Sequence, residues 1–240
     1  PEEVVAVEAV LPSRGPRPDV VVVVADATTL ERQLYLTQQI VDAGARVVVA
    51  LNMMDEARRA GVRIDVDALG AAVGAPMVPL VAAKGEGIDA LARAVEDALG
   101  TAYTERDPEP VDGALANEVA KVEAVFERMR PDDSPTERRA RALWALLSLG
   151  DDELEEIDAD LRETVASIHA SAEEQGRSLD REIIEARYAR IDEHMRVAVI
   201  TPDQGRPRWT ERIDAVLPHP VAGALTFAIV MFLLFEALFA

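Results

Sequence analysis

The 240-residue sequence contains no cysteine. This excludes disulfides, thiolate metal sites and cysteine nucleophiles, but it leaves the redox compartment open because it fits either side of a membrane. Lysine occurs only at Lys84 and Lys121, so arginine carries almost all the positive charge. With 44 Asp and Glu against 25 Lys and Arg, the formal net charge of −19 argues against nucleic acid as a partner, since such binding rests on neutralising phosphates.

A long charge-free run of mostly apolar residues lies near the C-terminal end. Val221–Phe235 has no charged residue and Glu236 is the only charge from 221 to 240. The stretch approaches the roughly 20 residues of a membrane span, so we expect the start of a transmembrane helix, with a buried core helix as the alternative. Arg206, Arg208 and Arg212 precede it, and the positive-inside rule places that side in the cytoplasm.

Residues 19–100 alternate between short apolar runs and amphipathic stretches. This pattern is typical of parallel strands that are buried on both faces and crossed over by helices. It predicts strands at Val20–Ala25, Val47–Leu51 and Met77–Leu80. The order is β-α-β-α-β-α, an α/β fold whose ligands bind at the carboxyl ends of the strands.

Three helices are expected between and after these strands. Thr28 and Glu31 have capping-box spacing and open a helix that ends at Gly44. A second helix runs from a cap at Asp65 to Gly74, and a third covers 88–99 and is closed by Gly100.

Residues 115–200 read as four amphipathic helices that pack as a small bundle. Ser134, Pro135 and Glu137 carry the cap, first-position proline and capping-box acid of the second helix. The four apolar stripes comprise Leu115, Val119, Val122, Phe126 and Met129; Leu143, Leu146 and Leu149 before Gly150; Leu154, Ile157, Leu161, Val165 and Ile168; and Ile184, Tyr188, Ile191 and Met195. The expected domains are an upstream remnant at 1–18, a partial α/β domain at 19–100, a linker at 101–114, the bundle at 115–200, a juxtamembrane segment at 201–219 and a truncated transmembrane helix at 220–240.

Two loops that follow successive strands carry the candidate site. Asn52 and Asp55 come directly after the second strand, where a fixed carboxylate can accept the two neighbouring donors of guanine and reject adenine. The second loop, Val81–Gly87, follows the third strand and contains two glycines that let the backbone approach a ligand. Ordinary turns use the same residue types, so the pattern alone leaves that alternative open.

Several separated segments resemble one family, the bacterial ferrous iron transporter FeoB. The likeness covers VVADATTLERQLYLT from Val23, VVALNMMDEA from Val48, KGEG from Lys84, EARYARI from Glu185 and RIDAVL from Arg212. It extends over nearly the whole chain in order. The resemblance implies the C-terminal half of a P-loop GTPase-like parallel sheet, followed by an all-α helical domain and the start of the first transmembrane helix.

The resemblance also implies roles for particular residues. Asn52 and Asp55 would read guanine, with Met53 packing on the base plane where many GTPases have lysine. Val81, Ala82 and Ala83 would form the second base loop, although Val81 lacks the hydroxyl of the usual Ser-Ala-Arg or Ser-Ala-Lys motif. GTP or GDP is the implied cofactor, bound weakly or not at all here, and Mg²⁺ belongs only to the intact protein.

The phosphate-binding motifs of that family are not found before the first predicted strand, where the family has them. The sequence has no G-x-x-x-x-G-K-[ST] loop, and upstream of the first strand it has neither an Asp-x-x-Gly to position Mg²⁺ nor a switch threonine. Because nothing then meets the transition-state charge, we expect no catalytic residues and no GTP hydrolysis by this chain alone. The strand that carries the phosphate loop in the family would lie beside Val20–Val24, so we also expect an exposed, apolar sheet edge here.

The implied function is that of a fragment of a GTP-dependent Fe²⁺ uptake transporter in the bacterial cytoplasmic membrane, with residues 1–219 on the cytoplasmic side. Its implied partners are the membrane, Fe²⁺ as transported substrate, and small cytoplasmic accessory proteins. His169, His194 and His219 are not at metal-ligand spacing, so no metal site is expected. The alternative is a catalytically inactive, membrane-tethered scaffold or interaction protein.

Overall fold

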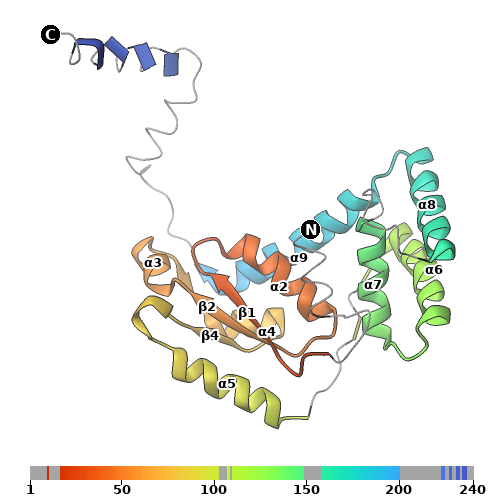
Figure 1. The fold of residues 1–240 in the computed structure, drawn as a ribbon, viewed down its shortest axis with the longest axis horizontal. Coiled ribbons are helices and arrows are strands. Elements are labelled where there is room, and N and C mark those ends of the chain that lie inside the picture. Colours follow the sequence, from red (N-terminus) through yellow and green to blue (C-terminus); the bar gives the residue numbers. More distant parts are fainter. Residues whose placement is uncertain are drawn as a thin grey trace. The chain divides into compact units, whose positions relative to one another are not determined.

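The computed structural model describes residues 17–102, 107–108, 110–148 and 158–200, together with Val10 and short stretches between 223 and 236. The chain divides into two compact units, residues 1–200 and residues 201–240. Figure 1 shows the first unit as a small sheet with helices around it and a group of helices beside it.

The sheet has three parallel strands in the order β1-β2-β4. They are β1 (Val21–Asp26), β2 (Val47–Asn52) and β4 (Met77–Pro79), and the register pairs Asp26 with Asn52 at the carboxyl ends of the first two. The predicted strands and α/β class are confirmed. Because the strands run parallel, the loops that follow β2 and β4 leave the same edge of the sheet.

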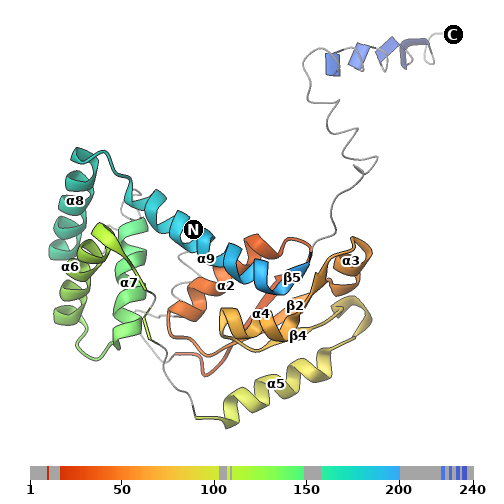
Figure 2. The same ribbon diagram turned by 180° about the vertical axis from the view of Figure 1, so that it is seen from behind.

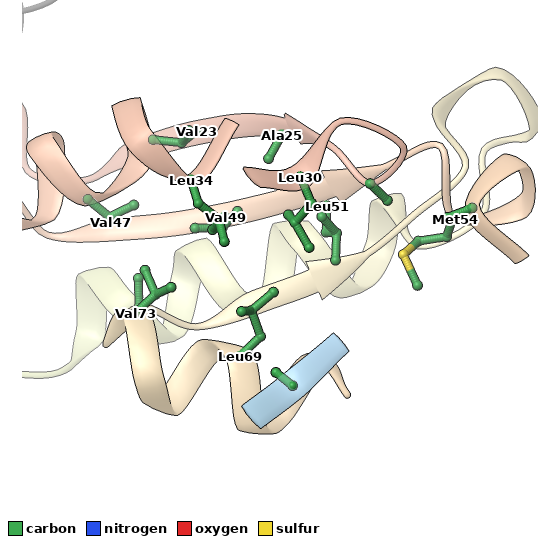
Figure 3. Close-up of a cluster of buried hydrophobic side chains, with 14 of the residues drawn as sticks. Val23, Ala25, Leu30, Leu34, Val47, Val49, Leu51, Met54, Leu69 and Val73 are labelled. Atoms are coloured by element: carbon green, nitrogen blue, oxygen red, sulfur yellow. The ribbon is translucent and has the colours of Figure 1, made fainter. Parts of the chain in front are cut away.

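One face of the sheet carries the larger hydrophobic core. Alternate strand residues pack there against α2 (Leu30–Asp42) and α4 (Val66–Val73), and Figure 3 shows these side chains meeting. The labelled residues of this cluster are Val23, Ala25, Leu30, Leu34, Val47, Val49, Leu51, Met54, Leu69 and Val73. Helix α5 (Ile88–Gly100) contacts β2 and β4 from the other face, so the middle strand is covered on both sides.

Strand β1 lies at the edge of this sheet, as expected. Val24 is 64% exposed and Val22 is also exposed, whereas Val23 and Ala25 between and beside them are buried. Among the described strands, β1 has a neighbour on one side only. An apolar strand edge of this kind favours edge-to-edge association.

The helix starts in this unit follow the sequence in part. Asp65 caps α4 as predicted, because its carboxylate accepts the Ala68 N–H at 3.0 Å, and Gly74 ends that helix in the left-handed conformation. The predicted cap at Thr28 is wrong. Asp26 Oδ1 accepts both the Thr28 N–H and the Thr28 hydroxyl at 2.7 Å, and α2 starts one residue later, with Thr29 as its N-cap. Gly100 is the last residue of α5 rather than a residue beyond it.

We expect the Asp65→Ala substitution to lower the free energy of unfolding by about 1 kcal/mol, because the first turn of α4 loses a hydrogen-bond acceptor. Thr29→Ala is the matched control, since Thr29 makes no side-chain cap bond. Urea denaturation of the two variants measures both effects. Equal losses for the two would contradict the cap assigned to Asp65.

The helical bundle is formed by α6 (Gly113–Met129), α7 (Pro135–Ser148), α8 (Ala159–Glu174) and the first half of α9 (Leu179–Ala198). The predicted capping box of α7 is confirmed: Ser134 Oγ accepts the Glu137 N–H at 3.2 Å, and the Glu137 carboxylate accepts the Ser134 N–H at 3.0 Å. Leu149, Gly150, Leu154 and Ile157 lie outside the described residues.

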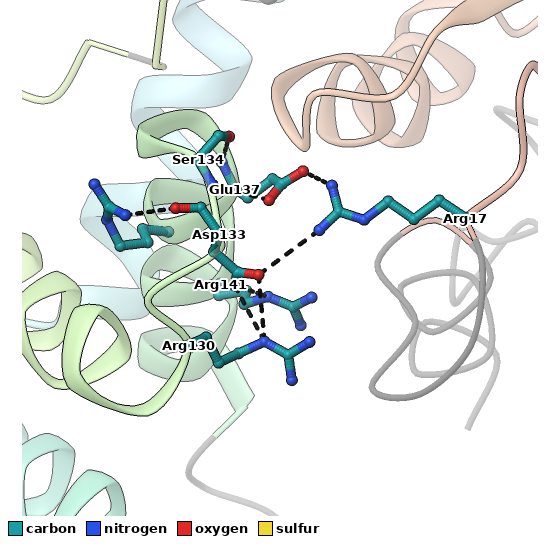
Figure 4. A network of polar contacts seen from close by, with 7 residues as sticks. Arg17, Arg130, Asp133, Ser134, Glu137 and Arg141 are labelled. Atoms are coloured by element: carbon teal, nitrogen blue, oxygen red, sulfur yellow. Dashed lines mark hydrogen bonds and ion pairs between the residues drawn. The ribbon is translucent and has the colours of Figure 1, made fainter.

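A buried ion cluster holds the start of α7 (Figure 4). The Asp133 carboxylate accepts hydrogen bonds from Arg141 Nε at 2.8 Å and Arg130 Nε at 3.2 Å, and Arg17 lies 3.7 Å from its other oxygen. Arg17 also pairs with Glu137. The segment that leads into β1 is therefore attached to the bundle.

Helix α9 belongs to both hydrophobic clusters. Leu179 and Ile183 pack in the bundle, whereas Ile191 and Ala198 pack in the core of the sheet. Figure 2 shows α9 running from the bundle across α2 and α4. Apart from α9 and Val199 after it, the described residues of the sheet cluster lie before position 100 and those of the bundle cluster lie after position 110.

The apolar stripe predicted for α9 is partly wrong. Ile184 and Tyr188 are exposed, while Ile183 and Arg187 one position earlier are buried. Tyr188 stacks on Tyr35 of α2 with 5.1 Å between ring centroids, so the exposed side of α9 still contacts the sheet domain. The buried face of α9 includes Arg187. A search for periodic apolar residues does not find this face, because arginine is not apolar.

Two very short strands close the first unit. β3 (Arg63–Ile64) and β5 (Val199–Ile200) form an antiparallel pair that joins the end of α9 to the segment just before α4. The Asp65 N–H also donates to the Ala198 carbonyl at 2.8 Å. The chain therefore leaves the first unit beside the segment that follows the Asn52 loop.

In the second unit, the residues described within 223–236 are helical. Residues 201–222 and the remainder of the predicted transmembrane stretch lie outside the described residues. Within the described part of the chain, no helix combines the length and apolar character that a membrane crossing needs.

Candidate functional site

The candidate site lies where β2 and β4 end. Asn52 is the last residue of β2, and Met53 connects it to a short helix, α3 (Met54–Arg59), that the sequence pattern did not reveal. Met53 has φ of 63°, the only described non-glycine residue in the left-handed region. Such a conformation costs of order 1 kcal/mol or more and is found most often where a loop is shaped for function.

The two predicted loops lie side by side. Asn52 Oδ1 accepts the Ala82 N–H at 3.0 Å, and the Leu80 N–H donates to the Leu51 carbonyl at 2.9 Å. A weaker bond runs from the Met54 N–H to the Leu80 carbonyl at 3.4 Å. The structure thus brings together the loops at Asn52 and Ala82, which are 30 positions apart in sequence.

The exposed part of the second loop begins after Val81. Val81 is 6% exposed and its side chain belongs to the hydrophobic core. Its N–H donates to the Glu86 carbonyl and its own carbonyl accepts the Lys84 N–H, so both backbone groups are engaged within the loop. The exposed turn is the 3-10 helix η1 (Ala82–Lys84), which presents Ala82 and Ala83 to solvent.

Lys84 is a site residue that the sequence pattern did not single out. Its Nζ lies 2.6 Å from Asp55 Oδ2, and Arg59 lies 3.6 Å from the same oxygen. The hydrogen bond from Lys84 lowers the pKa of Asp55 below its ordinary value, so the carboxylate stays ionised at neutral pH. The sequence did offer one signal: Lys84 follows β4 and Asp55 follows β2, and these two strands are neighbours in the sheet.

Gly87 fixes the end of the second loop. Its φ is +88°, and a Cβ at this position would lie 2.5 Å from the Pro79 carbonyl oxygen. Gly85 has φ of +73°, but a Cβ there would have no heavy atom within 4 Å. Only Gly87 is therefore required for close packing, and it holds the loop against the end of β4.

The described residues contain no group of three or more His, Cys, Asp and Glu that could hold a metal ion. His169 Nε2 contacts the Leu146 carbonyl oxygen at 2.9 Å and thereby links α8 to α7. His194 lies on α9, and burial lowers its pKa. His219 lies outside the described residues.

The parallel sheet and the two joined loops at its carboxyl edge define an α/β protein, followed by a helical bundle. Comparisons with known proteins agree with this class. The family model "Ferrous iron transport protein B" matches residues 1–95. The Fe(2+) transporter FeoB of Shigella flexneri is 31% identical over 225 residues, which cover 90% of this chain and 27% of that protein.

Two solved structures show the same fold. The cytosolic domain of L. pneumophila FeoB matches with a TM-score of 0.67 and 26% identity, over 83% of this chain and 74% of that chain. A GDP-bound point mutant of the S. thermophilus FeoB G-domain matches with a TM-score of 0.65 and 28% identity, over 83% and 75%. The predicted resemblance is confirmed: the chain matches a part of FeoB-type ferrous iron transporters. It spans about a quarter of the length of the curated relative.

Proposed function

We propose that this chain carries the guanine-recognising part of a FeoB-type GTPase domain and the helical spacer that couples it to a membrane pore. The observation that carries the proposal is the hydrogen bond from the Ala82 N–H to Asn52 Oδ1. This bond aligns two loops from neighbouring strands of the sheet, and Asp55 lies at the start of the helix that follows the first of them. The arrangement forms a rim against which a flat base can rest.

Asp55 is the residue proposed to read the base. A carboxylate accepts hydrogen bonds at both oxygens, and guanine offers a ring N–H and an exocyclic amino group side by side. Adenine would place an acceptor opposite one of these oxygens, which leaves a polar pair unsatisfied. Met53 is partly exposed between Asn52 and Asp55, and its thioether side chain suits packing on the base plane.

The same proposal assigns no phosphoryl chemistry to these 240 residues, because they contain no phosphate-loop motif. Base contacts alone give weak binding, so GTP or GDP would be held loosely, and no residue is assigned to Mg²⁺. The similar solved structure of the S. thermophilus FeoB G-domain contains bound GDP, which supports a guanine nucleotide as the class of ligand.

The Asp55→Asn substitution tests base recognition. We expect it to weaken GDP binding at least tenfold, because one acceptor oxygen becomes an amide donor that faces the donors of guanine. Binding of ADP should remain negligible in both proteins. Isothermal titration or ligand-observed NMR with the full chain measures these affinities.

Asp180→Asn is the control, because it removes the same charge from exposed Asp180 on α9, far along the chain from the loops. Equal affinity of the parent chain for GDP and ADP, or retention of GDP binding by the Asp55 variant, would refute base recognition. Such a result would favour the alternative of a membrane-tethered scaffold.

The remaining parts of the proposal concern the membrane and the transported ion. The charge-free run Val221–Phe235 and the arginines at 206, 208 and 212 support a first transmembrane helix at 220–240, with residues 1–219 on the cytoplasmic side of the bacterial inner membrane. The curated relative is named as an Fe²⁺ transporter, which supports Fe²⁺ as the substrate of the whole protein. Small cytoplasmic accessory proteins complete the proposed set of partners.

A further inference from the structure

Both carboxylate oxygens of Asp55 already have donors in the structure. Asp55 Oδ1 accepts the Glu56 N–H at 3.1 Å, and Oδ2 accepts a hydrogen bond from Lys84 Nζ at 2.6 Å. The Arg59 guanidinium, 3.6 Å from Oδ2, adds a second positive charge. The group proposed to read guanine is thus occupied by a side chain of the same protein.

The position of Lys84 is set by the loops rather than by the lysine itself. Its N–H donates to the Val81 carbonyl at 2.9 Å, and the Gly85 N–H donates to the Ala82 carbonyl at 3.0 Å. Since Asn52 holds Ala82, the backbone of the second loop is fixed relative to the first. Only the lysine side chain must move for the contact with Asp55 to break.

Lys84 and guanine require the same oxygen atom. A base that donates both its ring N–H and its amino group to Asp55 uses Oδ1 and Oδ2 together, and each oxygen can accept more than one hydrogen bond. The ammonium group at Oδ2 neutralises the carboxylate charge, so the base gains less from these contacts while Lys84 stays bound. The Lys84 side chain is 48% exposed, and its long flexible stem lets the ammonium swing into water when a base arrives.

We propose that Lys84 sets the affinity of the base site by occupying Asp55 when no nucleotide is bound and by competing with guanine for it. This inference rests on the proposed function. It predicts that Lys84 lowers guanine affinity and hastens release, because the ammonium recaptures the carboxylate as the base leaves. It also predicts that adenine, which cannot satisfy Asp55, leaves Lys84 in place.

The size of the effect follows from the exposure of the pair. Partly exposed ion pairs are worth little in water, so removing the competitor should strengthen GDP binding by about two- to fivefold rather than by orders of magnitude. Higher salt should reduce the difference, because it screens the pair in the parent chain.

The first experiment uses the fact that the chain has only two lysines, Lys84 and Lys121. In the full chain in mild detergent, both side chains are labelled with ¹³C-methyl groups and followed by NMR, and a Lys121→Met variant assigns the two signals. The Lys84 signal should shift on Asp55→Asn without nucleotide, and on GDP but not ADP addition to the parent chain. The Lys121 signal should stay constant.

The second experiment compares GDP affinity among unlabelled variants. Lys84→Met should bind GDP about two- to fivefold more tightly, and the pKa of Asp55 should rise toward its ordinary value. Lys84→Arg keeps the positive charge and should restore the affinity of the parent chain. Lys121→Met removes the same charge from α6 and should change nothing.

Each result decides the inference. Weaker or unchanged GDP binding by Lys84→Met overturns it, and so does a Lys84 signal that ignores Asp55→Asn. If no variant binds GDP, the proposed function fails and the competition fails with it. If GDP binds with preference over ADP but Lys84→Met shows no gain, the proposed function survives and only the competition is rejected.

Discussion

Replacing Gly87 with alanine is expected to destabilise the protein by about 3 kcal/mol or more. Two effects add at this position. The backbone has φ of +88°, which L side chains rarely adopt, and the new Cβ would lie 2.5 Å from the Pro79 carbonyl oxygen and 2.8 Å from the Leu80 Cβ. Since those atoms belong to the end of β4 and the residue after it, relief of the clash must displace the loop that presents Ala82 and Lys84.

Gly85 gives a matched control two positions away. It has a similar positive φ of +73°, but a Cβ there meets open space. Gly85→Ala should therefore cost about 1 kcal/mol, the conformational part alone. Urea denaturation of both variants separates the clash from the backbone strain, and equal costs would contradict the close approach of Gly87 to β4.

The Asp133→Ala substitution is expected to lower the free energy of unfolding by about 3–5 kcal/mol. Asp133 is 7% exposed and faces buried Arg141 and the more exposed Arg130 and Arg17, so its removal leaves three positive charges close together. Burial and repulsion from Arg130 already lower the pKa of Arg141, whereas Asp133 raises it. Loss of the carboxylate also removes one of the two ion pairs that Arg17 makes with the bundle, and the pair with Glu137 remains.

Asp160→Ala is the control for that variant. Asp160 pairs with Arg128 at 2.7 Å, but their side chains are 62% and 61% exposed, so this pair should contribute less than about 1 kcal/mol. Thermal and chemical denaturation of both variants test the contrast. A loss below about 1 kcal/mol for Asp133→Ala would show that the cluster adds nothing beyond a surface ion pair.

The elements that the sequence predicted well are those whose signals are local and strong. Each main strand is a continuous apolar run, and the caps at Asp65 and Ser134 use side chains that reach only three residues along the chain. The prediction of a cap at Thr28 was wrong for an equally local reason: the Asp26 carboxylate, two residues earlier, accepts hydrogen bonds from both the Thr28 N–H and its hydroxyl.

The parts that were missed depend on contacts between distant segments. β3 and β5 have two residues each and no pattern of their own, because each exists through its pairing with the other. The buried face of α9 includes Arg187, which lies with its guanidinium carbon 6.0 Å from the Tyr35 ring centre. Apolar periodicity counts an arginine as exposed and so selected the neighbouring face.

In the candidate site, too, local sequence signals were predictive and contacts between distant segments were missed. Asn52 and Asp55 were recognisable because they follow a buried strand, and the structure places them at the loop edge. The burial of the Val81 side chain in the core and the contact of Lys84 with Asp55 depend on the orientation of the 3-10 helix η1. Gly87 packs against the end of β4 at the close of the second loop, and this close approach is visible only in three dimensions.

Helix α9 delays the completion of the sheet's core during synthesis of the chain. Arg190 pairs with Asp42 across 148 positions, and Ile191 and Ala198 complete the core beneath a sheet whose strands all end by Pro79. At about 5–20 residues per second, a ribosome delivers Arg190 roughly 7–30 s after Asp42. The nascent sheet is complete only when Pro79 has been made, so it waits roughly 6–22 s for Ile191 with part of its core uncovered. A chaperone that shields α2 and α4 during translation would act on the same surface that α9 later covers.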